Sequence, residues 1–273
     1  MRRHLPILAA SLAGVLALAG SERPSRAQAR VDDLIAIETG TLPIVLSAPH
    51  GGTEPIPGCP ERKNGVRVRD EATGEVAVLV AAELEKELRA KPSVVRALFH
   101  RRFLDVNRSE DEGAEDPAAR PVYAAYHAAL RGFVDTARAR TKGRALLVDL
   151  HGQNKLPDTL VRGTRDRRTV AALLLRGGDE ALVGSKSIFG ALQDAGYATD
   201  PPRGAPFAQK ENRSFDGGFI VSTYGSHQKD GIDALQIEIG RDLRHEKAAR
   251  QKLAHDLAAA IVAFHRAFLV KPR

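Results

Sequence analysis

The sequence predicts a single α/β domain in which helices cover both faces of a central sheet. Short apolar runs alternate with longer segments of helical periodicity, which is the pattern of such a domain. Of the 273 residues, 43% are hydrophobic and 27% are charged, and these values exclude disordered, collagen-like and coiled-coil proteins. Residues 30–273 fit one large domain, because no internal repeat or low-complexity segment divides them.

The first 29 residues have the pattern of an export signal. Arg2 and Arg3 precede an apolar stretch at 5–20, which suits a signal core and is too short to span a bilayer comfortably. Residues 27–29 (Ala-Gln-Ala) form a small-x-small cleavage site, and a retained membrane anchor is the competing interpretation. We expect a mature periplasmic or secreted protein without a membrane anchor.

Charge and cysteine content limit the possible partners. Cleavage after Ala29 removes four basic residues and one acid, so the net charge falls from +7 to +4, which is too mild to indicate a nucleic-acid partner. The densest basic stretch, 162–168, is predicted to be a solvated loop. Cys59 is the only cysteine. Any metal must therefore bind His, Asp or Glu, and a thiol nucleophile is not expected.

The elements follow from periodicity. Helices are predicted where apolar side chains recur every three and four residues, and the last of these should pack on the sheet. The stretches 51–60 and 110–116 are predicted loops. Strands are predicted at 42–48, 94–99, 144–150 and 234–239, and helices at 75–89, 122–133 and 253–268.

Two histidines follow predicted strands, where ligands bind in open α/β sheets. His50 and His151 are each followed by glycine, which permits close approach. Two imidazoles and one carboxylate make a catalytic zinc site with an open position for water. Glu54 is the carboxylate nearest to His50 in sequence, whereas Asp149 can either orient His151 or bind metal itself. Taken singly, each histidine is more often a hydrogen-bonded structural residue, but two of them at equivalent strand ends with carboxylates nearby favour a metal site.

Glu238 is a candidate general base. Residues 235, 237 and 239 are apolar and share one face of the predicted strand, so Gln236 and Glu238 share the other. In a central strand the carboxylate would be desolvated, which raises its pKa and suits a base. The alternative is an edge strand with Glu238 in solvent.

Other polar residues suit substrate binding. Asn107 and Arg108 offer an amide and a guanidinium side by side for a carboxylate, although a loop salt bridge with Asp105 or Glu110 explains them equally. His227 is a candidate for polarising a substrate carbonyl. The sequence contains no Gly-x-Ser-x-Gly elbow, phosphate loop or Gly-x-Gly-x-x-Gly turn, which excludes the corresponding hydrolase and nucleotide-binding classes.

Five motifs in order resemble the N-formylglutamate amidohydrolase family. They are Ser47–Glu54, Asp105–Arg108, Asp149–Gly152, Gly217–Ile220 and Leu235–Ile239. More distantly, the arrangement is similar to zinc carboxypeptidases and aspartoacylase. This resemblance implies a mostly parallel mixed sheet of the zinc carboxypeptidase or phosphorylase/hydrolase-like type.

The resemblance also implies residue roles. His50, Glu54 and His151 would hold Zn²⁺, with Asp70 as the alternative to Glu54. Glu238 would be the catalytic base. Asn107 and Arg108 would bind the substrate carboxylate. Independently of the resemblance, Arg102 and His227 are further candidates for substrate contact.

The expected activity is zinc-dependent hydrolysis of an amide bond in a substrate that bears a free carboxylate. N-acyl amino acids, N-formylglutamate-like compounds and γ-glutamyl or peptidic material fit this description. The alternative is an exported, catalytically silent module that binds acidic ligands or cell-wall polymers through Arg102, Arg108 and the basic 162–168 stretch. Such a module needs no stoichiometric metal.

Overall fold

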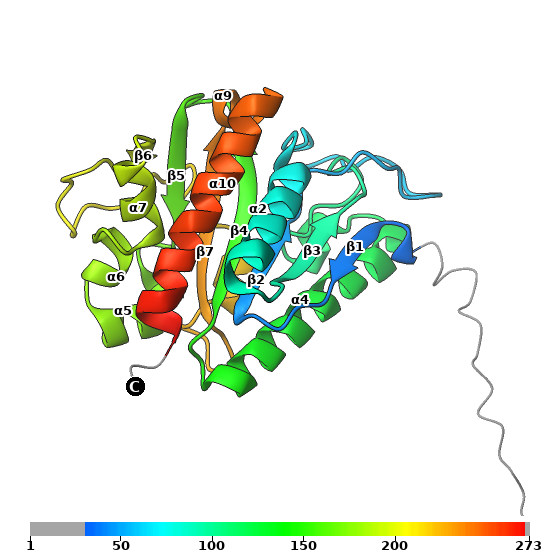
Figure 1. Cartoon of the computed structure of the whole chain (residues 1–273). Helices are drawn as coiled ribbons and strands as arrows, with labels where there is room; N and C mark the ends of the chain where they lie inside the picture. The colour runs from blue at the N-terminus through cyan, green and yellow to red at the C-terminus, as the bar shows by residue number, and fades with distance from the viewer. Residues whose placement is uncertain (1–30, 271–273) are drawn as a thin grey trace, which may run out of the picture.

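One mixed sheet organises the computed structural model, which describes residues 31–270 (Figure 1). Its strands are β1 (Ile35–Glu38), β2 (Ile44–Ala48), β3 (Ser93–Ala97), β4 (Leu146–Gln153), β5 (Thr159–Gly163), β6 (Ala198–Asp200) and β7 (Asp233–Gly240). Their order across the sheet is β1-β3-β2-β4-β7-β5-β6. The β1–β3 and β5–β7 pairs are antiparallel, and the other pairs are parallel. The predicted α/β domain with a mostly parallel mixed sheet is confirmed.

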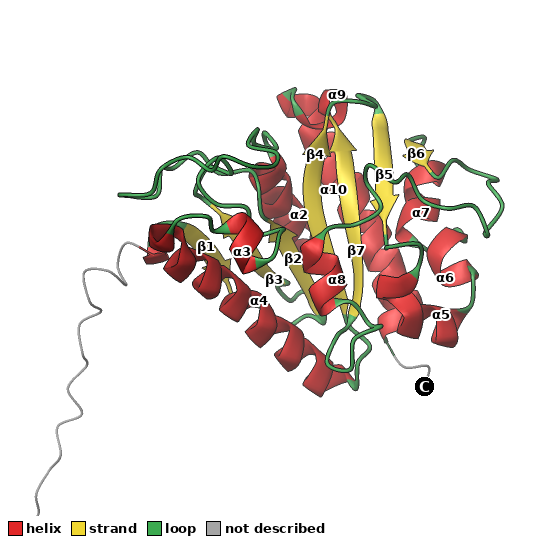
Figure 2. Cartoon of the chain, turned by 180° about the vertical axis from the view of Figure 1, so that it is seen from behind, coloured by secondary structure: helices red, strands yellow, loops and turns green. Residues whose placement is uncertain are grey.

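Helices cover both faces of this sheet (Figures 1 and 2). On one face, α2 and α10 lie side by side, with α5 to α7 beside them, and on the other face lie α4 and α8. The helices are α2 (Thr73–Leu88), α3 (Glu110–Gly113), α4 (Arg120–Thr141), α5 (Ala171–Gly177), α6 (Glu180–Val183), α7 (Ile188–Asp194), α8 (Phe219–Tyr224), α9 (Arg241–Arg244) and α10 (Lys247–Phe264). No helix within 31–270 is long and apolar enough to span a bilayer.

The core has two layers because successive strand residues point to opposite faces. In β2, Ile44 and Leu46 pack with α2 and α10, whereas Val45 packs on the α4 side. Both layers consist of buried apolar side chains, so the inner strands are covered on both faces. This explains why they appear in the sequence as continuous apolar runs.

The predicted strands at 42–48, 94–99, 144–150 and 234–239 correspond to β2, β3, β4 and β7. The three long predicted helices correspond to α2, α4 and α10, the last followed by a π-helical turn at His265–Leu269. β1, β5 and β6 were not predicted. They have three to five residues each, too few for a clear period, and β5 carries an arginine.

That arginine corrects one prediction. Residues 162–168 are not a solvated loop, since Arg162 lies in β5 and is only 5% exposed. The buried guanidinium is paired with the buried carboxylate of Glu211, which sequence separation concealed. The proposed export signal lies outside the described residues.

Candidate metal and active site

Four parallel strands bring the polar residues of the site to one edge of the sheet. His50 follows β2, and Asp105 and Asn107 follow β3. His151 lies near the end of β4 and is in register with Glu238 of β7. Because β3, β2, β4 and β7 are consecutive neighbours, their carboxyl ends place these side chains together, as expected for open α/β sheets.

The two histidines meet at Asp70. Nδ1 of His50 lies 3.3 Å, and Nδ1 of His151 lies 3.4 Å, from the same oxygen, Oδ2 of Asp70. One ligand atom from each of the three residues lies within 4.8 Å of the others, and all three residues are buried. In a tetrahedral zinc site with bonds of about 2.0–2.1 Å, neighbouring ligand atoms lie about 3.3 Å apart. The donor set and its spacing therefore fit a zinc ion.

The other nitrogen of each imidazole is held by a separate carboxylate. Nε2 of His50 lies 2.7 Å from Asp105, and Nε2 of His151 lies 2.8 Å from Asp149. Such carboxylate–imidazole pairs fix the ring orientation of metal-binding histidines and leave the second nitrogen free to bind. Both Nδ1 atoms are thereby directed at Asp70.

Charge in this cluster is arranged to keep the carboxylates ionised. Burial alone would raise the pKa of Asp70, but hydrogen bonds with His151 and His50 hold it well below its usual range. Burial would also raise the pKa of Asp105, but the nearby His50 and Arg101 outweigh this effect and lower it. Despite its burial, His151 has a raised pKa because Asp149 and Asp70 contact it.

Arg101 and Arg244 are buried components that sequence reasoning did not identify. Arg101 donates from Nε to Asp105 at 3.0 Å and from Nη1 to Asp70 at 3.5 Å, and so links the partners of His50. Arg244 donates to backbone oxygens of Glu71, Gln153 and Ile239. Both arginines line the cleft beside the histidines.

Glycine is required at two places around the cluster. The Gly152 N–H donates to Asp70 at 3.1 Å, and a Cβ at this position would lie 2.6 Å from the Arg244 guanidinium. At Gly218, a Cβ would lie 2.1 Å from the side chain of Asn107. Backbone therefore approaches the site more closely than any side chain would allow.

Glu238 faces the same cleft as the metal cluster. Its strand β7 lies between β4 and β5, so the central position is confirmed and the exposed-edge alternative is wrong. Burial raises the pKa of Glu238, and its Oε1 accepts a hydrogen bond from Gln236 at 2.8 Å. The structure provides a desolvated carboxylate beside His151, as a general base requires.

Asn107 and Arg108 also line the cleft, but they are not equivalent. The Asn107 side chain is already engaged, since its Oδ1 accepts from the Ile220 N–H at 2.8 Å and its Nδ2 lies 3.3 Å from His151. Within residues 31–270, the Arg108 guanidinium donates one hydrogen bond, from Nη1 to the Asn107 carbonyl. Arg108 is thus the freer of the two for a substrate carboxylate.

Three other candidates lie apart from the cluster. Glu54 is exposed, and its carboxylate accepts from the Thr53 hydroxyl. The chain after His50 turns outward here, so that the Glu54 backbone bridges to Phe99 beyond β3. Asp70, the alternative to Glu54, is the carboxylate that lies beside the two histidines.

Arg102 and His227 do not line this cleft either. Arg102 is half exposed and paired with Glu61, and it borders a neighbouring hollow with His100. His227 lies 3.3 Å from the Gln228 amide, and burial together with Arg168 and Arg165 lowers its pKa. These two residues are placed outside the group that meets at Asp70.

The cleft has a volume of about 470 Å³ and is rich in cations. Among residues 31–270, Arg108, Lys155 and Arg213 line it without an ion-pair partner. One wall is a turn in which Arg165, Asp166 and Arg167 all have positive φ. Left-handed residues in succession are costly and persist only when neighbours hold them. Here the Glu211 carboxylate accepts from the Thr164 and Asp166 N–H groups.

The model of the N-formylglutamate amidohydrolase family matches residues 118–244. The resemblance to that family is confirmed. The matched range includes His151 and Glu238, and it supports an amide-bond hydrolase as the class of enzyme. The more distant likeness to zinc carboxypeptidases and aspartoacylase stays a prediction.

Two solved structures share the fold. An N-formylglutamate amidohydrolase from Ralstonia eutropha JMP134 has 19% identity and a TM-score of 0.59, over 84% of this chain and 97% of that one. The gene product Atu2144 from Agrobacterium tumefaciens has 16% identity and a TM-score of 0.56, over 85% and 95%. No curated protein sequence matches the chain. At these identities, the two structures support the fold of the family and nothing finer.

Proposed function

We propose that this chain is an exported, zinc-dependent amidohydrolase that cleaves an amide bond in a substrate carrying a carboxylate. The observation that carries the proposal is the convergence of two Nδ1 atoms on one oxygen of Asp70, with Glu238 in the same cleft. Two imidazoles and a carboxylate form the protein ligand set of many catalytic zinc sites. The family match supplies the amidohydrolase chemistry.

In the proposed reaction, His50, Asp70 and His151 would hold the zinc ion, which would supply Lewis-acid chemistry at the attacking water and the scissile carbonyl. Glu238 accepts the proton of the attacking water and returns it to the leaving amine, for which its raised pKa is suited. Arg108 binds the substrate carboxylate and so fixes the scissile carbonyl in position.

The cleft favours an acidic substrate. Lys155 and Arg213 lie in its wall with no acidic side-chain partner in the described part of the chain. N-acyl amino acids, N-formylglutamate-like compounds and γ-glutamyl peptides all present a carboxylate near an amide bond. The export signal proposed for residues 1–29 would place the reaction in the periplasm or outside the cell.

The proposal is tested by measuring hydrolysis of a panel of N-formyl, N-acetyl and γ-glutamyl amino acids. We expect turnover that a chelator abolishes and zinc restores. Glu238→Gln should retain zinc and lose about 10²–10⁴-fold in kcat, whereas Glu87→Gln, a change at an exposed helix position, should behave as the wild type.

Equal activity in the zinc-free protein, or full activity in Glu238→Gln, would contradict the mechanism. Binding of the panel without turnover and without sensitivity to chelation would favour the silent binding module instead.

A further inference from the structure

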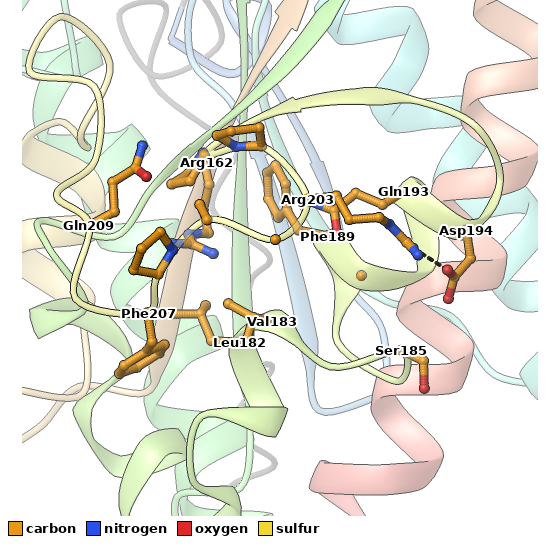
Figure 3. A pocket seen from close by; sticks show the side chains of 16 residues that line it. Arg162, Leu182, Val183, Ser185, Phe189, Gln193, Asp194, Arg203, Phe207 and Gln209 are labelled. Atoms are coloured by element: carbon orange, nitrogen blue, oxygen red, sulfur yellow. Dashed lines mark hydrogen bonds and ion pairs between the residues drawn. The ribbon is translucent and has the colours of Figure 1, made fainter.

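A second cavity lies apart from the proposed catalytic cleft. It has a volume of about 200 Å³ and shares no lining residue with the cleft. Its walls come from β5, from the region of α6 and α7, and from the loop at 201–209 (Figure 3). Nothing in the proposed reaction uses this cavity.

Arg162 is the buried cation of this cavity. Its side chain is 6% exposed, and only Nε has a partner, the Glu211 carboxylate at 2.8 Å. Neither Nη1 nor Nη2 has a hydrogen-bond partner within residues 31–270. A buried guanidinium normally satisfies several of its five N–H donors. Two terminal nitrogens without partners, on a side chain that lines a cavity, form a fork that matches one carboxylate.

Glu211 does not use up the binding capacity of Arg162. Its carboxylate also accepts from the Thr164 N–H, the Thr164 hydroxyl and the Asp166 N–H. These bonds tie Glu211 to the turn that follows β5. The carboxylate therefore has four donors, whereas the guanidinium has one acceptor and faces the cavity with its other end.

Part of the remaining lining is apolar and can contact the apolar body of a ligand. Phe189 lies under the Arg162 guanidinium, 6.0 Å from the ring centroid, and Leu182, Val183 and Phe207 line the same space (Figure 3). The other arginine of the cavity, Arg203, is paired with Asp194. The two terminal nitrogens of Arg162 offer one fork, which matches a single carboxylate better than a phosphate dianion. A cavity of about 150 Å³ accepts benzene, so this one has room for a benzoate-sized molecule.

We propose that this cavity is a binding site for a small organic monocarboxylate, whose carboxylate is held by Nη1 and Nη2 of Arg162 and whose apolar body lies among Phe189, Leu182 and Phe207. The site is separate from the proposed hydrolase centre and does not depend on its activity.

Benzoate binding, measured by calorimetry on the purified protein, tests this proposal. We expect saturable 1:1 binding and at least roughly tenfold weaker binding of benzamide, which has the same shape without the charge. Arg162→Met should weaken benzoate binding by at least roughly tenfold. Arg203→Gln is the matched control in the same cavity and should change it by less than about twofold.

Since Arg162→Met leaves Glu211 buried and unpaired, the double variant Arg162→Met with Glu211→Gln removes both charges. Val183→Trp adds bulk at an exposed position in the cavity wall and keeps both charged residues, and it should also abolish binding. Absence of saturable benzoate binding would overturn the proposal. So would unchanged binding in both Val183→Trp and the double variant, or displacement of benzoate by equimolar inorganic phosphate.

Discussion

At the scale of single residues, the Asp70 carboxylate joins separate parts of the chain. It lies against both histidines, accepts from the Gly152 N–H and contacts Arg101. The Asp70 N–H also donates to the His50 carbonyl at 2.9 Å, which fixes this loop on the end of β2. A side chain with so many ordered contacts is positioned before any ligand arrives, as a metal site requires.

Substitution of Asp70 separates the two candidates for the third ligand. Asp70→Asn should lower zinc affinity by at least about 100-fold, because it removes the anionic oxygen that both Nδ1 atoms face. Glu54→Gln should leave affinity unchanged, since Glu54 is exposed and bonded to Thr53. Zinc content after dialysis against a metal buffer measures both. Zinc loss in Glu54→Gln with full zinc in Asp70→Asn would contradict the placement.

Sequence reasoning identified both imidazoles and the base, but for the third member it preferred Glu54 and named Asp70 only as the alternative. His50, His151 and Glu238 sit at strand ends that apolar periodicity reveals. Asp70 lies 20 residues after His50, in a loop without periodicity. The hydrogen bond from its N–H to the His50 carbonyl holds it beside that histidine. Arg101 and Arg102 were indistinguishable in sequence for a similar reason. The turn after β3 buries the first and exposes the second.

At the scale of elements, His127 of α4 connects α8 with the loop that carries Asn107. This side chain donates from Nε2 to the Val106 carbonyl at 2.9 Å and lies 2.9 Å from the Tyr224 hydroxyl. Its ring also packs against Tyr123 and Phe219. Burial lowers the pKa of His127 to about 4, so the ring is neutral in the folded protein at neutral pH.

This buried histidine makes stability depend on pH. Below about pH 6.5 the unfolded chain binds a proton at His127 that the folded chain does not. Its contribution is therefore complete above pH 6.5 and is lost as pH falls towards 4, by up to about 3 kcal/mol. In urea unfolding, His127→Gln should flatten the fall in unfolding free energy between pH 6.5 and 4.5, and His255→Gln, at an exposed position, should not. Identical slopes in His127→Gln and the wild type would count against this account.

The elements missed by sequence reasoning are those that other elements stabilise. β5 is short, contains Arg162 and runs antiparallel to β7. Its guanidinium is compensated by Glu211, which lies 49 residues away in sequence. No local pattern reports such a partner, so a charged residue in a short strand was interpreted as a loop.

At the scale of the whole molecule, the topology itself assembles the site. Four consecutive parallel strands end at one edge and deliver His50, Asn107, His151 and Glu238 there. The loops after β3 and before α2 add the carboxylates that orient and complete the cluster. The fold class was predictable because the alternation of apolar runs and helices extends over the entire domain. The contacts between loops that are distant in sequence were not predictable, because no local pattern reports them.

Anomalous diffraction at the zinc edge, from crystals of the zinc-loaded protein, tests the central claim most directly. The account predicts one strong peak at about 2 Å from Nδ1 of His50, Nδ1 of His151 and a carboxylate oxygen of Asp70, in the cleft that Glu238 faces. A peak bonded to Glu54 instead of Asp70, or no peak between the two histidines, would contradict it.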